Sequence, residues 1–124
     1  MRKDRPYGNY KLEGVGPDEE TIVNEKGASQ SKCDTYYLGL PPLALHAVSK
    51  LLQTGAEKYG KWNWTAIERD QHLEHAQRHL AAWCAGDTQE GEPLEHLLHF
   101  VCRALFALDV ELRGEQDAVK TLSL

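Results

Sequence analysis

The chain has 124 residues, with 14 Lys and Arg against 19 Asp and Glu, and a formal charge of −5. This balance and a sequence pI of about 5.6 exclude a general duplex nucleic-acid-binding protein, which needs a basic surface. No segment approaches the roughly 20 apolar residues that span a bilayer, and the first residues lack the apolar core of a signal peptide. We therefore expect one cytoplasmic domain with no membrane or duplex nucleic-acid partner.

The first part of the chain differs in composition from the rest. Residues 1–32 carry six basic and six acidic residues and almost no apolar periodicity. Such a composition buries little surface and is typical of an extended or flexible segment. We therefore assign residues 1–22 to a flexible N-terminal arm.

Apolar residues at helical spacing predict three helices in the remainder. They are expected to span residues 42–58, residues 65 or 68 to 85, and residues 93–113. Pro41-Pro42 precedes the first helix, and Gly86 and Gly114 are positioned to end the second and third. No longer stretch alternates with the period of a strand. The predicted fold class is therefore all-α, a small helical bundle of three main helices with an extended N-terminal arm.

The predicted helical domain covers residues 23–113, and residues 114–124 are expected to form a weakly ordered tail. The third helix carries an apolar stripe of Leu94, Leu97, Leu98, Val101, Leu105 and Leu108. Three helices of this length enclose only a thin core, so part of that stripe remains uncovered in one chain. We therefore expect a homodimer or a higher homo-oligomer.

The cysteines indicate neither a disulfide framework nor a zinc site. Cys33, Cys84 and Cys102 are odd in number and show no Cys-x-x-Cys spacing. Free thiols are often buried as small apolar groups. We place Cys84 and Cys102 in the core because both lie in apolar-periodic segments.

Histidines are concentrated on the second and third predicted helices, where five of the six fall within 28 residues. The spacing of three and four residues places them on one face of each helix. Two polar stripes result: Glu68, His72, His75 and His79 on the second helix, and Glu92, Glu95 or His96, His99 and Arg103 on the third. Antiparallel helices joined by a short loop bring such stripes together, which favours a site. The alternative is that both stripes are solvated faces.

The residue types near these stripes suit phosphate chemistry. Arg78 offers a bidentate fork and His79 a titratable donor for a phosphate group. The carboxylates of Glu90, Glu92 and Glu95 are hard oxygen ligands, which suit Mg²⁺ or Mn²⁺ bound together with a phosphate substrate.

The loop after the first helix is a second candidate site. Here Lys58, Lys61 and Asn63 stand beside Trp62 and Trp64. Cations next to flat aromatic faces can hold a stacked nucleobase. The alternative is a helix–helix connection whose tryptophans cover the core.

Five runs of the sequence carry a family resemblance. They are Asn24-Glu25-Lys26-Gly27, Leu40-Pro41-Pro42-x-Ala44-Leu45, Gly55-Ala56-Glu57-Lys58-Tyr59-Gly60-x-x-Asn63-Trp64, Arg78-His79-Leu80-x-Ala82-Trp83-x-x-Gly86-Asp87, and His96-Leu97-x-His99. In this order, over about residues 23–112, the chain resembles the N-terminal domain family of phage dATP/dGTP diphosphohydrolases. The resemblance also implies that residues 24–32 are ordered.

The resemblance implies hydrolysis of purine deoxynucleoside triphosphates to monophosphate and pyrophosphate in the cytoplasm of a phage host. By analogy to all-α MazG-like pyrophosphohydrolases, it implies a magnesium-dependent mechanism. Matched by position, it implicates Lys58, Asn63, Arg78, His79, His96 and His99. The family's Asp-Pro-Glu-Ser-Gly stretch is replaced here by Glu90-Gly91-Glu92-Pro93, one residue shorter.

Three hypotheses of function follow. The first is a nucleotide pyrophosphohydrolase in which Arg78, His79 and His99 act in catalysis and a metal binds Glu90, Glu92 and Glu95. Its substrate would be held by Lys58, Lys61, Trp62, Asn63, Trp64 and His96. The second is a non-catalytic nucleotide-binding protein that sequesters a host nucleotide signal. The third is a helical subunit whose polar stripes bind a partner protein.

Overall fold

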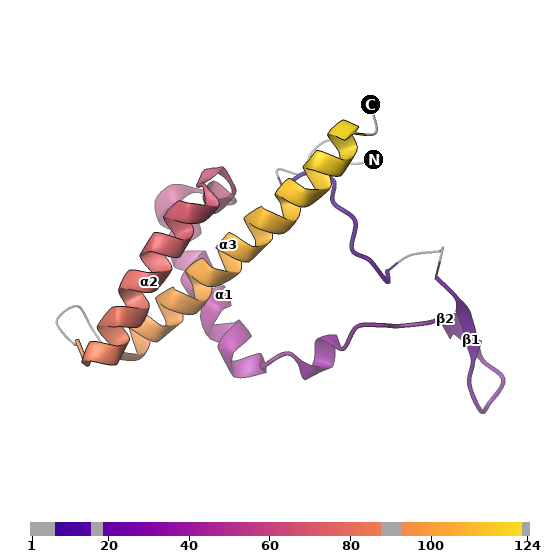
Figure 1. Ribbon diagram of the computed structural model, residues 1–124. Helices are drawn as coiled ribbons and strands as arrows, with labels where there is room; N and C mark the ends of the chain where they lie inside the picture. The colour runs from indigo at the N-terminus through magenta and orange to yellow at the C-terminus, as the bar shows by residue number, and fades with distance from the viewer. Residues whose placement is uncertain (1–6, 16–18, 88–92, 123–124) are drawn as a thin grey trace.

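The computed structural model describes residues 7–15, 19–87 and 93–122. Its helices and strands are β1 (Thr21–Val23), β2 (Ser29–Ser31), α1 (Pro42–Tyr59), α2 (Arg69–Ala85) and α3 (Pro93–Leu122), with short 3-10 turns at Tyr37–Gly39 and Asn63–Ala66. α2 and α3 run side by side as an antiparallel pair, and α1 crosses behind α3 in the view of Figure 1. The all-α fold class with three main helices is confirmed. None of the helices in the described ranges combines the length and apolarity that a bilayer crossing requires.

Local sequence accounts for most helix ends. Pro42 occupies the first position of α1, where its missing N–H costs nothing. α2 ends at Gly86, whose φ of +71° is the left-handed conformation that favours glycine. Its N–H bonds to the carbonyl groups of Ala82 and Trp83 and so satisfies the last turn of the helix.

The hairpin of β1 and β2 was not predicted. Its strands pair antiparallel, with Ile22 opposite Gln30. The side chain of Asn24 forms the turn, because its Oδ1 accepts hydrogen bonds from the backbone N–H of Lys26 at 2.9 Å and of Ala28 at 3.0 Å. The hairpin stands apart from the helices at the far end of an extended segment (Figure 1).

The buried interior is small and lies mainly between α2 and α3. The buried apolar residues in the described part of the chain are Val48, Ala76, Cys102 and Ala107, and His72 is completely buried. Cys102 is therefore in the core as predicted, and burial raises its pKa to about 11. The core position predicted for Cys84 is wrong, because Cys84 is exposed, outside the face that α2 turns toward α3.

α3 is longer than the sequence predicts. It continues through Gly114 to Leu122, so the helix end predicted at Arg113 is wrong. A glycine in a helix interior costs only about 1 kcal/mol, which contacts elsewhere can offset.

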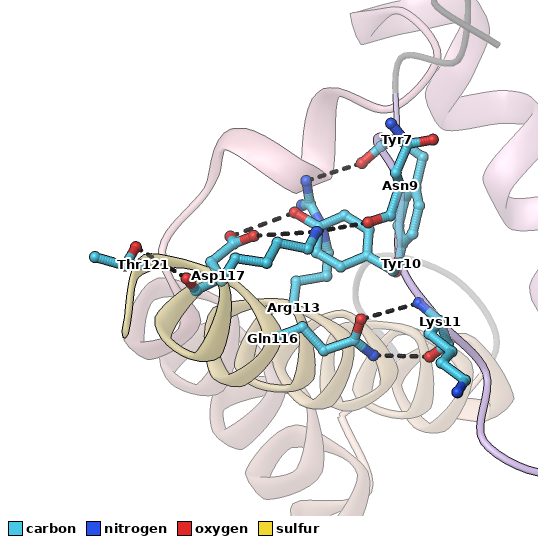
Figure 2. A network of polar contacts seen from close by, with 9 residues as sticks. Tyr7, Asn9, Tyr10, Lys11, Arg113, Gln116, Asp117 and Thr121 are labelled. Atoms are coloured by element: carbon cyan, nitrogen blue, oxygen red, sulfur yellow. Dashed lines mark hydrogen bonds and ion pairs between the residues drawn. The ribbon is translucent and has the colours of Figure 1, made fainter. Parts of the chain in front are cut away.

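The N-terminal segment supplies such contacts, because Tyr7–Lys11 lies along this half of α3 (Figure 2). Lys11 and Gln116 exchange two hydrogen bonds, from the Lys11 N–H to Oε1 at 2.9 Å and from Nε2 to the Lys11 carbonyl at 2.8 Å. Arg113 donates from Nη2 to the Tyr7 carbonyl at 3.1 Å, and its guanidinium lies 4.8 Å from the centre of the Tyr7 ring. Lys120 donates to the carbonyl of Asn9 at 2.6 Å.

Tyr7 is the residue through which the N-terminal segment meets both α3 and the tryptophan turn. Its hydroxyl donates to the carboxylate of Asp109, and its ring lies 5.3 Å from that of Trp62. Burial and the Asp109 carboxylate raise the pKa of Tyr7 to about 12, so the hydroxyl remains a donor near neutral pH.

We expect Tyr7→Ala to lower the free energy of unfolding by about 2 kcal/mol, because it removes a hydrogen bond and a ring packed on Trp62 and Arg113. Amide hydrogen exchange should accelerate most in residues 114–122. Leu12→Ala is the matched control, because Leu12 is 61% exposed. Equal exchange in the two variants would contradict the contact.

Candidate functional site

A line of polar side chains fills the interface between α2 and α3, and it begins at His72. The imidazole of His72 is fully buried. Its Nε2 lies 2.9 Å from the carbonyl oxygen of Trp64, and Nη1 of Arg103 lies 2.8 Å from its Nδ1. A carbonyl and a guanidinium have fixed roles, so Nε2 carries the proton and donates to Trp64, while Nδ1 accepts from Arg103.

Three further imidazoles meet at the other end of the interface. The Nδ1 atoms of His79 and His96 are 3.2 Å apart. One of these nitrogens carries a proton and donates a hydrogen bond, and the other accepts that bond through its lone pair. The ring of His99 stacks on that of His79 at 4.8 Å and an interplanar angle of 21°. Nε2 of His96 lies 3.9 Å from a carboxylate oxygen of Asp87, the residue after Gly86. The sequence-predicted residues His79, His96 and His99 are therefore brought together.

Helix geometry explains why the His72–Arg103 and His79–His96 contacts form together. His72 and His79 are seven residues apart on α2, and His96 and Arg103 are seven residues apart on α3. Seven residues are close to two turns, so each pair occupies one face of its helix, and a single antiparallel register satisfies both contacts. We name the imidazoles of the two stripes, together with Arg103, the histidine seam: His72, His75, His79, His96, His99 and Arg103.

The surroundings keep four of the seam imidazoles neutral near pH 7. Burial is the largest cause that lowers the pKa of His72, His75, His79 and His99. The positive charge of Arg103 lowers all four further. Neutral imidazoles hold a free nitrogen lone pair, which is the state required of a proton acceptor or a metal ligand.

These lowered pKa values predict a loss of stability in acid. Below about pH 6.5, the usual histidine pKa, these histidines bind protons in the unfolded chain but not in the folded chain. The free energy of unfolding therefore falls as pH falls. For the fully buried His72 the loss is about 1.4 kcal/mol per pH unit until its lowered pKa is reached. Urea unfolding at about pH 7.5 and about pH 5.5 measures this, and equal free energies would contradict it.

The predicted tryptophan site is packed against the protein itself. The ring of Trp64 stacks on Phe106 at 4.6 Å and 5°, and Trp62 lies against Tyr7. Trp62 also holds a φ of +66°, a strained conformation for a large side chain. These contacts correspond to the alternative in which the tryptophans cover the core. Their predicted role in binding a base stays a prediction.

The tryptophan turn and the three adjacent imidazoles lie at opposite ends of the seam. Trp64 contacts His72, and the seven residues from His72 to His79 rise about 10 Å along α2. Lys61 and Asn63, on the turn, are exposed. Exposed Lys58 lies over the ring of its neighbour Tyr59, with Nζ 5.1 Å from the centroid.

Arg78 is an exposed residue of α2, near enough to His75 for its charge to lower the pKa of that imidazole. Its side chain is 69% exposed, and its Nε pairs with Glu74 one turn earlier at 3.3 Å. The structure therefore does not place its guanidinium beside His79, although the two are adjacent in sequence. Its predicted role at phosphate stays a prediction.

The predicted metal ligands are described only in part. Glu95 is exposed at the start of α3, and its charge acts to raise the pKa of the nearby His99. Glu90 and Glu92 lie outside the described residues. Within residues 7–15, 19–87 and 93–122, no three His, Cys, Asp or Glu side chains gather so as to hold a metal ion. The seam itself offers nitrogen, which Mg²⁺ does not prefer.

Residues 24–120 match the family described as dATP/dGTP diphosphohydrolase, N-terminal. The chain belongs to this family. The matched region includes α1, α2 and nearly all of α3, so the whole seam lies within it. Comparison with curated proteins and with solved structures gave no match.

The sequence did not assign a site role to four residues that the geometry brings into the seam or beside it. His72, His75 and Arg103 were recognised only as members of the polar stripes. The seven-residue spacing of His72 from His79 and of Arg103 from His96 was the available signal. Asp87 stood only at the end of one run that carries the family resemblance, and its approach to His96 depends on how the chain leaves α2 at Gly86.

Proposed function

We propose that this member of the dATP/dGTP diphosphohydrolase N-terminal family is a nucleotide hydrolase that converts purine deoxynucleoside triphosphates to monophosphate and pyrophosphate. The observation that supports it is the adjacency of His79, His96 and His99, which come from both helices and lie within the family match. The three rings are partly buried, and Asp87, the residue after Gly86, lies beside His96.

The order of contacts supports His79 as the proton acceptor. The carboxylate of Asp87 favours a proton on the facing Nε2 of His96. Nδ1 of His96 then holds a lone pair and accepts the Nδ1–H of His79 at 3.2 Å. This leaves Nε2 of His79 without a proton. Asp87 and His96 are thus positioning residues that fix the tautomer of His79.

In the proposed step, Nε2 of His79 removes a proton from water while the water oxygen bonds to the α-phosphorus. The bond from that phosphorus to the pyrophosphate oxygen breaks, and pyrophosphate leaves with the bonding electrons. His99 stacks on His79 and is the second candidate for this proton transfer. Arg103 is bound to His72 at the other end of the seam, but its charge acts on His79 and His99 and so favours the approach of the phosphate chain.

The divalent metal stays a separate proposal. Mg²⁺ or Mn²⁺ would neutralise phosphate charge, and Glu95, together with Glu90 and Glu92, supplies the oxygen ligands proposed for it. The steps above use only residues of the seam and Asp87, because Glu95 is the one proposed ligand in the described part of the chain.

The test is incubation of the purified chain with the common ribo- and deoxynucleoside triphosphates. Mg²⁺, Mn²⁺ and EDTA are compared, and products are identified by mass spectrometry. We expect dGTP or dATP to yield its monophosphate and pyrophosphate. A triphosphate that raises the melting temperature without being consumed would overturn hydrolysis in favour of sequestration. Intact triphosphates without a thermal shift would overturn both.

A further inference from the structure

A second stripe of apolar residues runs along α3, on the side opposite the histidine seam. Its members are Leu94, Leu98, Val101, Leu105, Leu108, Leu112 and Val119. From Leu94 to Leu112 they alternate at spacings of four and three residues, the heptad pattern of helices that pack along a shared seam. At 3.6 residues per turn, these positions point away from His96, His99 and Arg103. We name this set the leucine stripe.

The leucine stripe is only partly covered within one chain. Leu105, Leu108 and Leu112 are 43%, 56% and 48% exposed. α1 borders the stripe, and Val48 and Leu52 line an apolar groove with these three residues. The crossing of α1 behind α3 in Figure 1 shows why one helix cannot cover the whole length of the other.

The total surface indicates how much remains to be covered. The chain exposes 10214 Å², whereas a compact monomer of its mass exposes roughly 6,700 Å². A stable protein–protein interface buries about 800 Å² from each partner. Part of the excess belongs to the extended segment that carries the hairpin, where residues 21–41 are all exposed, and the partly exposed leucine stripe of α3 adds to it.

The charges beside the leucine stripe favour an apolar occupant. Asp109 and Glu111 flank Leu108 and Leu112 along α3. Asp109 already accepts from Tyr7, and Glu111 pairs with Arg69 at 2.7 Å. The flanking carboxylates thus have partners within the chain. Glu111 is neutralised within the chain, and Asp109 keeps its charge but already has a hydrogen-bond donor. Neither carboxylate needs a basic group from a partner, so the apolar stripe can meet the same stripe of a second copy, as a two-fold interface requires.

We propose that a second copy of this chain covers the leucine stripe, with α3 packed against α3 of the partner in a two-fold dimer. The helices of the second copy fill the groove between α1 and α3. The seam lies on the opposite side of α3, so a dimer formed in this way does not cover it.

The test is the mass of the full chain in solution, by light scattering or sedimentation up to about 100 µM. We expect a dimer of the 14.0 kDa chain. The double variant Leu105→Glu, Leu112→Glu is expected to be monomeric and to keep its helical circular dichroism, since both residues are exposed in one chain. The control is Leu73→Glu, because Leu73 on α2 is also 43% exposed and lies outside the stripe. This variant should remain dimeric.

A monomeric native chain, or a double variant that stays dimeric, would overturn the proposal. If the double variant loses helix, cross-linking decides the matter. Leu108→Cys, made together with Cys33→Ser and Cys84→Ser to remove the exposed thiols, should give a covalent dimer with a short bis-maleimide. A chain that stays uncross-linked under these conditions contradicts the interface.

Discussion

Replacing His72 with alanine is expected to lower the free energy of unfolding by about 3 kcal/mol at neutral pH. The side chain is completely buried, so its removal leaves a cavity between α2 and α3. The Trp64 carbonyl loses its donor, and Arg103 loses its acceptor. Urea unfolding followed by circular dichroism measures the loss.

Gln71→Ala is the matched control, because Gln71 precedes His72 on α2 and is exposed. Its effect is expected to stay below about 0.5 kcal/mol. The double variant with Arg103→Ala adds a second check. If His72 and Arg103 interact as described, the two losses fail to add by about 0.5–3 kcal/mol. Additive losses, or a His72→Ala loss below about 1 kcal/mol, would contradict the buried contact.

The three helices could be predicted because each has a local cause. Apolar periodicity and flanking proline or glycine placed the start of α1 at Pro42 and the end of α2 at Ala85, as observed. The end of α3 could not be predicted, because residues after Gly114 bond to partners more than 100 positions away in sequence. Those contacts offset the small free-energy cost of one glycine within the helix.

The hairpin escaped prediction for a different reason. Each strand has three residues, all exposed, which is too few for an alternating pattern to be recognised. Its signal lay in the turn, where Asn24 and Gly27 satisfy the backbone and supply a φ of +82°. The family resemblance, rather than periodicity, indicated order in this segment.

The candidate site was predictable where it depends on helix spacing and not where it depends on the loops. Spacing identified the stripes that meet in the seam. It could not show that Tyr7 and Phe106 would pack against Trp62 and Trp64, because aromatic packing of this kind is long-range. The outward turn of Arg78 toward Glu74 likewise depends on which face of α2 meets α3.

His79→Ala is expected to lower kcat for the proposed hydrolysis by roughly 100- to 10,000-fold, the usual contribution of a positioned proton acceptor. The fold should survive, because His79 is half-buried and its partners are two other imidazoles. Single-turnover measurements with dGTP or dATP separate this loss from a change in substrate affinity. Gln77→Ala is the control, because Gln77 lies on the exposed side of the same helix.

A second variant, at Asp87, tests the tautomer of His79 in the same experiment. Asp87→Asn removes the charge that favours a proton on Nε2 of His96. Without it, His96 and His79 can adopt the opposite tautomers, in which Nε2 of His79 carries a proton and cannot accept one. We expect kcat to fall and its dependence on pH to change, whereas loss of a structural contact alone would lower kcat equally at every pH. A His79→Ala loss below about tenfold would remove His79 as the acceptor and leave His99, its stacked neighbour, as the residue to test.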